Sequence, residues 1–208
     1  EENVRVDGFF GGTCLYLPKL TKAGKRNQEE CIEAKANLHS KLAEEPHTPI
    51  VYAQLWTGYI SQKLHMEGKK RPLKLTLSDF LARLERFLQS QSTRRIMLLS
   101  QAPRPPKGDL NCNLTPSFLP RKGVLCGVFS AARSDTGEAL VNQGLKDMAA
   151  RLAHVTFLQS QKALCSTGVC ISEYEGKKLY SDRHHFSVQG SELVIKRYRE
   201  TILDNLRP

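Results

Sequence analysis

The segment Arg95-Ile96-Met97-Leu98-Leu99-Ser100-Gln101 decides the fold class of this chain. It is a short, mostly apolar run that ends at Ala102-Pro103, as expected of a strand buried on both faces of a sheet. Two other runs, Ile50 to Trp56 and Val155 to Leu158, have the same character. Three such runs predict a mostly parallel sheet, because parallel sheets are covered by helices on both faces.

Segments with helical spacing of apolar residues separate the predicted strands. Four helices are expected, over Asn27 to Ala43, Thr76 to Leu88, Ala139 to Leu152 and Val188 to Leu206. Thr76 and Asp79 have the spacing of a capping box, and Ser187 is placed to cap the last helix. The alternation predicts an α/β fold, a three-layer α/β/α sandwich with a mostly parallel sheet, in one domain over residues 1–208.

Functional groups in such sheets lie just beyond the carboxyl ends of the strands. This rule directs attention to Trp56 to Tyr59, to Gln101 to Pro103, and to the loop before the last helix. Two stretches lack a regular period. Leu64 to Leu75 is basic and contains glycine and proline, so we expect a surface loop, and residues 103–136 are proline-rich and expected to be irregular.

The six cysteines form three couples that are close in sequence. The couples are Cys14 with Cys31, Cys112 with Cys126, and Cys165 with Cys170. This spacing fits disulfides that close loops in an oxidising compartment, although six cysteines allow about 15 pairings. Free buried cysteines in a cytosolic protein are the alternative. No CxxC pair or zinc-ribbon spacing occurs, so we expect no structural metal site.

The chain is basic, with a net charge of +10, and its surface is expected to attract polyanions. The lysines and arginines are scattered, and no aromatic-rich RNA-binding signature accompanies them, so nucleic acid is not an expected partner. The hydrophobic fraction of 40% is that of an ordinary globular protein. No apolar run approaches the roughly 18 residues that a transmembrane helix needs.

The segment Tyr180-Ser181-Asp182-Arg183-His184-His185-Phe186-Ser187 carries the most informative chemistry. An aspartate three residues before a histidine, at a helix entrance, can accept a hydrogen bond from one imidazole nitrogen. The other nitrogen is then free to take a proton from a serine hydroxyl, as in a serine hydrolase. This spacing also arises by chance, so the alternative for Asp182 and His185 is a helix-start carboxylate beside a surface histidine.

The closing part of the chain resembles the end of the SGNH domains that are fused to acyltransferase type 3 membrane proteins. In that family a cysteine pair is followed by Tyr-x-Asp-x-x-His-Leu-Ser, with a glycine three residues on, before the final helix. The matching residues here are Cys165 with Cys170, Tyr180 to Ser187, and Gly190, with Phe186 in place of the leucine.

The resemblance implies catalytic roles for two residues. His185 would act as general base, Asp182 would orient it, and neighbouring His184 would be a bystander. A looser similarity to the family's strand that ends in Trp-x-x-Tyr implies Trp56 and Tyr59 as substrate contacts. A buried anchor for packing is the alternative for Trp56.

One part of the family pattern is absent from this chain. The family's nucleophilic serine lies in a Gly-Asp-Ser sequence, and no Gly-Asp-Ser occurs here. Gly12 to Pro18 is similar to a segment that follows this serine in the family. We therefore expect the missing block, and with it the first strand of the sheet, to lie upstream of Glu1.

The resemblance implies acyl transfer in the periplasm. A serine from the missing block, with His185 and Asp182, would pass an acetyl group to a sugar hydroxyl of a surface polysaccharide or lipopolysaccharide. An acyltransferase type 3 transmembrane domain would take that group from acetyl-CoA, and the SGNH-like domain itself would hold no cofactor. The alternatives are a carbohydrate or lipid esterase that uses water as acceptor, and an inactive basic domain that binds glycan.

Overall fold

The computed structural model describes most of the chain. The described residues are 14–18, 20–22, 28–60, 64–66, 72–73, 75–106, 127–131 and 136–206. The chain divides into two compact units, a first unit of residues 1–48 and 58–94 and a second unit of residues 49–57 and 95–208. One domain over residues 1–208 stays a prediction. Within the described residues, no helix combines the length and apolar composition that a membrane span requires.

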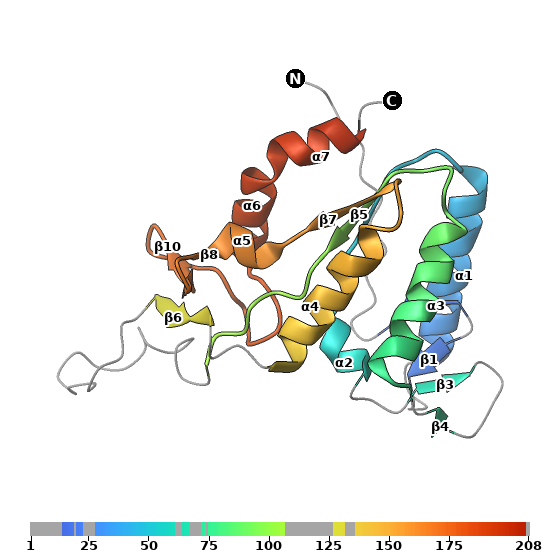
Figure 1. Cartoon of the computed structure of the whole chain (residues 1–208), viewed down its shortest axis with the longest axis horizontal. Helices are drawn as coiled ribbons and strands as arrows, with labels where there is room; N and C mark the ends of the chain where they lie inside the picture. Colours follow the sequence, from blue (N-terminus) through green and yellow to red (C-terminus); the bar gives the residue numbers. More distant parts are fainter. Residues whose placement is uncertain are drawn as a thin grey trace. The chain divides into compact units, whose positions relative to one another are not determined.

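A three-stranded parallel sheet forms the centre of the second unit (Figure 1). Its strands in spatial order are β2 (Ile50–Tyr52), β5 (Ile96–Leu99) and β7 (Val155–Leu158). The register aligns Ile50 with Ile96 and Ile96 with Val155. The first three residues of the middle strand, β5, have no exposed surface. The three predicted strands are therefore confirmed, and the apolar run at 95–101 is the buried centre of this sheet.

Helices cover both faces of this sheet. They are α4 (Thr136–Ala149) and α7 (Arg199–Leu206), while α5 (Ser160–Leu164) follows β7 and packs with α6 (Val188–Arg197). α4 packs on β7 and α7 packs on β5, and the two helices lie on opposite sides of the sheet in Figure 1. This arrangement confirms the predicted α/β class with a parallel sheet between helical layers.

The predicted strand from Ile50 to Trp56 is too long. The strand ends at Tyr52, and Trp56 begins the short helix α2 (Trp56–Ile60). The Trp56 amide donates to the Gln54 carbonyl over 3.0 Å, which turns the chain out of the sheet. An apolar run does not show where pairing stops, so this boundary was not visible in the sequence.

The predicted last helix is two helices. α6 ends at its C-cap residue Tyr198, whose φ of −106° and ψ of 10° interrupt the helical course before α7. The Tyr198 hydroxyl donates to the Gln159 carbonyl over 2.6 Å, across to the segment before α5. The cap at Ser187 is confirmed, since its hydroxyl accepts from the Gly190 amide over 3.0 Å.

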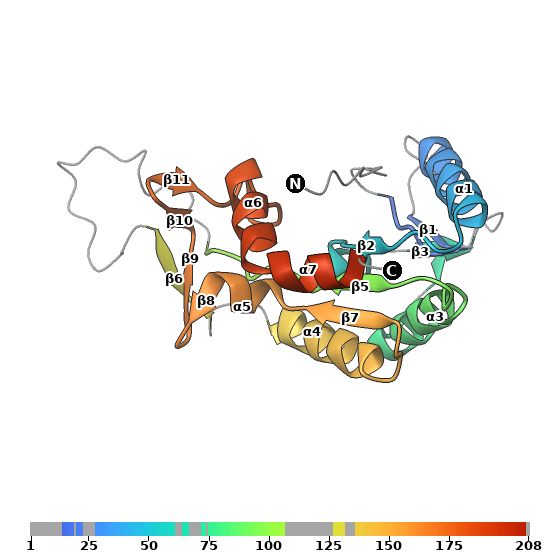
Figure 2. The same cartoon turned by 90° about the horizontal axis from the view of Figure 1, so that it is seen from above.

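A small antiparallel sheet and a hairpin complete the second unit. The strands of the small sheet, in spatial order, are β6 (Val128–Ser130), β9 (Val169–Ile171) and β8 (Cys165–Ser166). The hairpin pairs β10 (Glu173–Tyr174) with β11 (Lys177–Lys178). Figure 2 shows β11 beside α6, which it contacts. A core cluster that includes Phe129, Leu179, Tyr180 and Leu193 joins this sheet to α6.

The first unit contains two long helices and an antiparallel sheet. Its elements are α1 (Gln28–Glu44), α3 (Leu77–Gln89), β1 (Leu20–Lys22), β3 (Leu64–Met66) and β4 (Pro72–Leu73). The capping box of Thr76 and Asp79 at the start of α3 is confirmed. The surface loop predicted for Leu64 to Leu75 is wrong in part, because Leu64 is buried and pairs with Lys22.

Two of the three cysteine couples are disulfides. The sulfur atoms are 2.03 Å apart in Cys14–Cys31 and 2.06 Å apart in Cys165–Cys170. The third couple, Cys112 and Cys126, lies outside the described residues, as does most of the stretch predicted to be irregular. The couples that can be compared therefore agree with the local pairing suggested by the sequence.

Candidate functional site

The residues of the predicted catalytic pair lie together in one turn between Leu179 and α6. Tyr180 and Phe186 form an antiparallel bridge, and the Ser181 amide donates to the His185 carbonyl over 3.0 Å. The chain therefore reverses direction over residues 181–185. This reversal brings the Asp182 carboxylate back towards the His185 ring.

Three hydrogen bonds in this turn are made to one carboxylate, that of Asp182. Asp182 Oδ2 is 2.7 Å from His185 Nδ1. Asp182 Oδ1 accepts the amide hydrogens of His184, over 2.6 Å, and of His185, over 2.9 Å. With Nδ1 bound to the carboxylate, the Nε2 atom of His185 is left to accept a proton. No hydrogen bond engages Nε2 within the described part of the chain.

The surroundings of the turn set its electrostatics. Burial raises the pKa of Asp182, but hydrogen bonds from the His185 ring and from the amides of His184 and His185 outweigh it, so the pKa is lowered. Burial, followed by the positive charge of Arg104, lowers the pKa of His184. The side chains of His185 and Asp182 are 61% and 56% exposed. The Asp182 carboxylate is thus ionised and hydrogen-bonded to the His185 ring, and both side chains are open to solvent.

The residues after the pair explain the end of the motif. Ser187 donates its hydroxyl to the Lys178 carbonyl over 2.6 Å and its amide to the Leu179 carbonyl over 3.0 Å. It also caps α6 through the Gly190 amide. A Cβ on Gly190 would lie 1.9 Å from the Leu179 carbonyl oxygen, so only glycine fits. The serine and glycine of the motif therefore hold the start of α6 against the Leu179 backbone, just before the turn.

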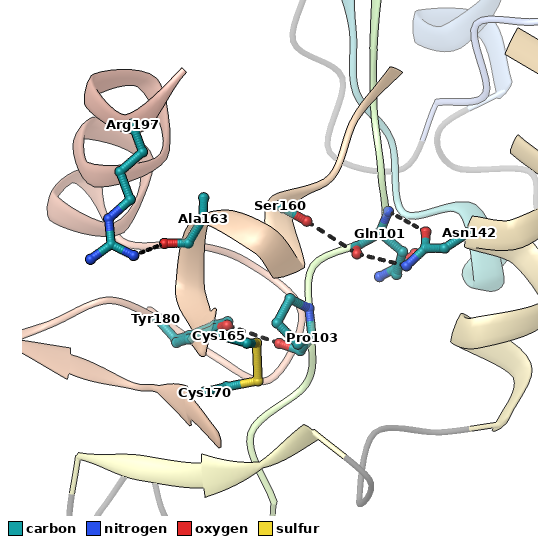
Figure 3. The surroundings of a disulfide bond; sticks show 9 residues. All are labelled: Gln101, Pro103, Asn142, Ser160, Ala163, Cys165, Cys170, Tyr180 and Arg197. Atoms are coloured by element: carbon teal, nitrogen blue, oxygen red, sulfur yellow. Dashed lines mark hydrogen bonds between the residues drawn. A yellow bond between two sulfur atoms is a disulfide. The ribbon is translucent and has the colours of Figure 1, made fainter. Parts of the chain in front are cut away.

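A second group of polar residues lies beyond the carboxyl end of β5. Gln101 exchanges two hydrogen bonds with Asn142 of α4, over 2.8 and 3.1 Å (Figure 3). Arg104 forms an ion pair with Glu138 of α4 and donates to the hydroxyl of Thr57. The strand-end rule pointed to Gln101, but nothing in the sequence marked Glu138 or Asn142 as partners of this loop.

The two residues predicted to contact substrate, Trp56 and Tyr59, both belong to α2. Trp56 has no exposed surface; its indole N–H donates to the Leu99 carbonyl over 2.9 Å, and its ring packs edge-on against Tyr52. Tyr59 belongs to α2, and its side chain lies outside the described residues. A substrate contact at either residue stays a prediction, while the packing role considered for Trp56 matches its burial.

The described residues contain no cluster of three or more histidine, cysteine, aspartate or glutamate side chains that could hold a metal ion. The described turn contains a hydrogen-bonded Asp–His pair. A carboxylate that fixes one imidazole nitrogen and leaves the other exposed can take a proton from a hydroxyl group.

Comparisons with known proteins show the family and the fold of the chain. A protein family described as the SGNH domain fused to AT3 domains matches residues 1–200. The fold is similar to that of the periplasmic domain of a lipopolysaccharide acetyltransferase from Salmonella ser. Paratyphi A, with a TM-score of 0.57 and 14% identity. This likeness covers 90% of this chain and 69% of that one.

A structure from Streptococcus pneumonia, named for platelet activating factor, gives a TM-score of 0.42 and 20% identity over 61% of this chain and 51% of that one. No curated protein sequence matches this chain. The family match covers nearly the whole sequence, while the lipopolysaccharide acetyltransferase domain supports the fold alone.

Proposed function

This chain belongs to the family of SGNH domains that are fused to AT3 domains, and from that membership we propose that it is an O-acyltransferase domain. The family gives the chain an acyltransferase-related role. The transferred group is proposed to be acetyl, and the acceptor a sugar hydroxyl of a surface polysaccharide or lipopolysaccharide. The lipopolysaccharide acetyltransferase domain of similar fold supports this choice and a periplasmic location, as do the two disulfides.

The observation that carries the proposal is the contact of 2.7 Å between His185 Nδ1 and Asp182 Oδ2. It fixes the tautomer in which Nε2 is unprotonated, and the lowered pKa keeps Asp182 negative as the imidazolium forms. His185 is then the general base and Asp182 the residue that orients it.

The proposed reaction has two steps, and in each of them His185 takes a proton and gives it up again. A serine attacks the acetyl donor while His185 Nε2 takes the serine proton, which is returned to the leaving group. The acceptor hydroxyl then attacks the acetyl-serine, gives its proton to Nε2, and releases serine, which recovers that proton. The serine is proposed to belong to a Gly-Asp-Ser segment that these 208 residues lack.

The proposed donor system lies in the membrane. Family members are fused to AT3 domains, and such a transmembrane domain is the proposed partner of this one. It would receive acetyl groups from acetyl-CoA and deliver them to the serine. The present domain is proposed to hold no cofactor of its own, because its part of the reaction needs only proton transfer and a nucleophile.

The direct test is His185→Ala in the full-length membrane protein, with His184→Ala as the matched control. Loss of a general base is expected to lower glycan O-acetylation by about 10²- to 10⁴-fold. His184 is a neighbouring histidine with no role in the proposed reaction, so its substitution should leave acetylation nearly unchanged. Normal acetylation in the His185 variant would overturn the proposal.

Hydrolysis is the second candidate function, because the His185 side chain is 61% exposed and water can reach it. Water in place of the sugar hydroxyl would make the same residues an esterase. Acetate release and acetyl transfer, measured in parallel on the full-length protein, separate the two. Release that is unaffected by the acceptor glycan would favour the esterase.

A further inference from the structure

The turn that carries Asp182 and His185 rests on a proline-rich segment, residues 101–106, that follows β5. The Tyr180 hydroxyl donates to the Pro103 carbonyl over 2.9 Å, as Figure 3 shows. Arg183 Nε donates to the Pro105 carbonyl over 3.3 Å. The two donors flank Asp182 in the sequence, so the turn is held on both sides of its carboxylate.

Residues 101–106 are suited to act as a rigid support. Three of the six are proline, which fixes φ and removes the N–H donor, so few backbone conformations are open to them. Gln101, Pro103 and Pro105 are buried and the residues between them are half-buried, an alternation typical of extended chain. Carbonyl groups two residues apart on such a chain point the same way, which places both acceptors towards the turn.

The support is itself anchored to two helices. Arg104 forms its ion pair with Glu138, which is 1% exposed in α4, and donates to Thr57 in α2. Gln101 is held by Asn142, also in α4. The position of the turn is therefore linked, through the prolines, to the helix that packs on β7.

We propose that Tyr180 and Arg183 are positioning residues, which hold the Asp182–His185 turn on the carbonyls of Pro103 and Pro105. Neither side chain has a part in the proposed proton transfers; both act by keeping the imidazole in one orientation. That this positioning serves catalysis rests on the proposed function of His185. That the turn is held in place rests on the two hydrogen bonds and on the anchored proline segment.

A purely structural role for Tyr180 is the competing explanation. Tyr180 is 3% exposed, and its ring packs against Phe129 and Phe186, with centroid distances of 6.2 and 5.2 Å. Tyr180→Phe keeps this ring and removes only the hydroxyl. Tyr198→Phe is the matched control, because the Tyr198 hydroxyl also donates to a backbone carbonyl, that of Gln159 in the same unit.

The measurement is a carboxyl ¹³C NMR titration of Asp182 in the chain and its two variants. If Tyr180 positions the turn, its loss weakens the hydrogen bonds that lower the pKa of Asp182, so that pKa rises towards the ordinary value of aspartate. Tyr198→Phe should leave the pKa of Asp182 where it is. An unchanged pKa in the Tyr180 variant, or an equal change in both variants, would overturn the proposal.

Arg183→Lys is a second test of the positioning role, and it changes no core residue. It keeps the positive charge beside Asp182 but loses the guanidinium nitrogen that reaches Pro105, so a raised pKa of Asp182 reports the lost hydrogen bond. An unchanged pKa would refute the role of Arg183. These titrations do not depend on catalysis. The pKa of Asp182 can rise in both variants even if His185→Ala leaves acetylation intact. The proposed function and the positioning role of Tyr180 and Arg183 can therefore fail independently of each other.

Discussion

Gly190 lies directly against the backbone of Leu179, so that a Cβ on Gly190 would be 1.9 Å from the Leu179 carbonyl oxygen. That oxygen also accepts a hydrogen bond from the Ser187 amide, which fixes the start of α6 beside the turn that carries Asp182 and His185. The start of α6 and the Leu179 backbone cannot keep this separation if residue 190 has any side chain larger than hydrogen.

Gly190→Ala is therefore expected to lower the free energy of unfolding by about 1–3 kcal/mol, the usual cost of forcing extra atoms into a packed site. Urea denaturation measures the change. Gln189→Ala, at the exposed neighbouring position in α6, is the control and should stay within about 0.5 kcal/mol of the unchanged chain. Equal stability of the two variants would contradict the close contact.

The lowered pKa of Asp182 predicts a pH dependence of stability with a definite sign. A carboxyl whose pKa is lower in the folded state binds fewer protons there, so its stabilisation is complete above the pKa of unfolded aspartate, near about 4. It is lost as the pH falls through the lower folded-state pKa.

Asp182→Asn removes this contribution. The free energy of unfolding of the unchanged chain should fall towards that of the variant as the solution is acidified below about pH 4. Urea denaturation of both proteins over this range measures the difference. A gap that widens on acidification would reverse the assigned sign.

The two disulfides should differ in their contribution to stability. Cys14–Cys31 closes 17 residues and Cys165–Cys170 closes 5. If the main effect is on the entropy of the unfolded chain, replacing the first pair by serine costs about 3 kcal/mol and the second about 2 kcal/mol. Urea denaturation of the two double variants compares them, and the opposite order would show that this entropy does not dominate.

The buried ion pair of Arg104 with Glu138 has an exposed counterpart in Arg199 with Glu200. Glu138→Gln leaves an uncompensated charge in the interior and is expected to cost about 3–5 kcal/mol. Glu200 and Arg199 are 77% and 66% exposed, so Glu200→Gln should change stability by less than about 1 kcal/mol. Similar costs in chemical denaturation would argue against a special role for the buried pair.

Substitution of Trp56 by phenylalanine tests whether its burial or a substrate contact matters. The variant loses the hydrogen bond to the Leu99 carbonyl and part of the indole packing, so a stability loss of about 1–3 kcal/mol is expected. A packing role leaves the KM for the acceptor in the full-length protein unchanged. A raised KM with unaltered stability would support the predicted substrate contact.

The sequence predicts the elements whose signals are local. The run at 95–101 is apolar enough to identify a buried strand without knowledge of the neighbouring strands. Thr76 and Asp79 mark the start of a helix through a hydrogen bond between residues three positions apart. The pairing of Asp182 with His185 is also a local signal, because their hydrogen bond joins residues three positions apart.

Features that depend on distant residues were not predictable in the same way. Trp56 leaves the strand with its indole bonded to Leu99, 43 residues away. The last helix is divided at Tyr198, whose hydroxyl bonds a residue 39 positions earlier. No spacing rule connects such pairs, since only the folded sheet brings them together.

The supported turn has a consequence for the order of folding events. The hydrogen bond between Asp182 and His185 spans 3 residues, whereas the bonds of Tyr180 and Arg183 to the proline segment span 77 and 78. Contacts between distant residues close large loops and form slowly. During refolding, we therefore expect the hydrogen bond between Asp182 and His185 to form before the turn that carries it is held on the proline segment.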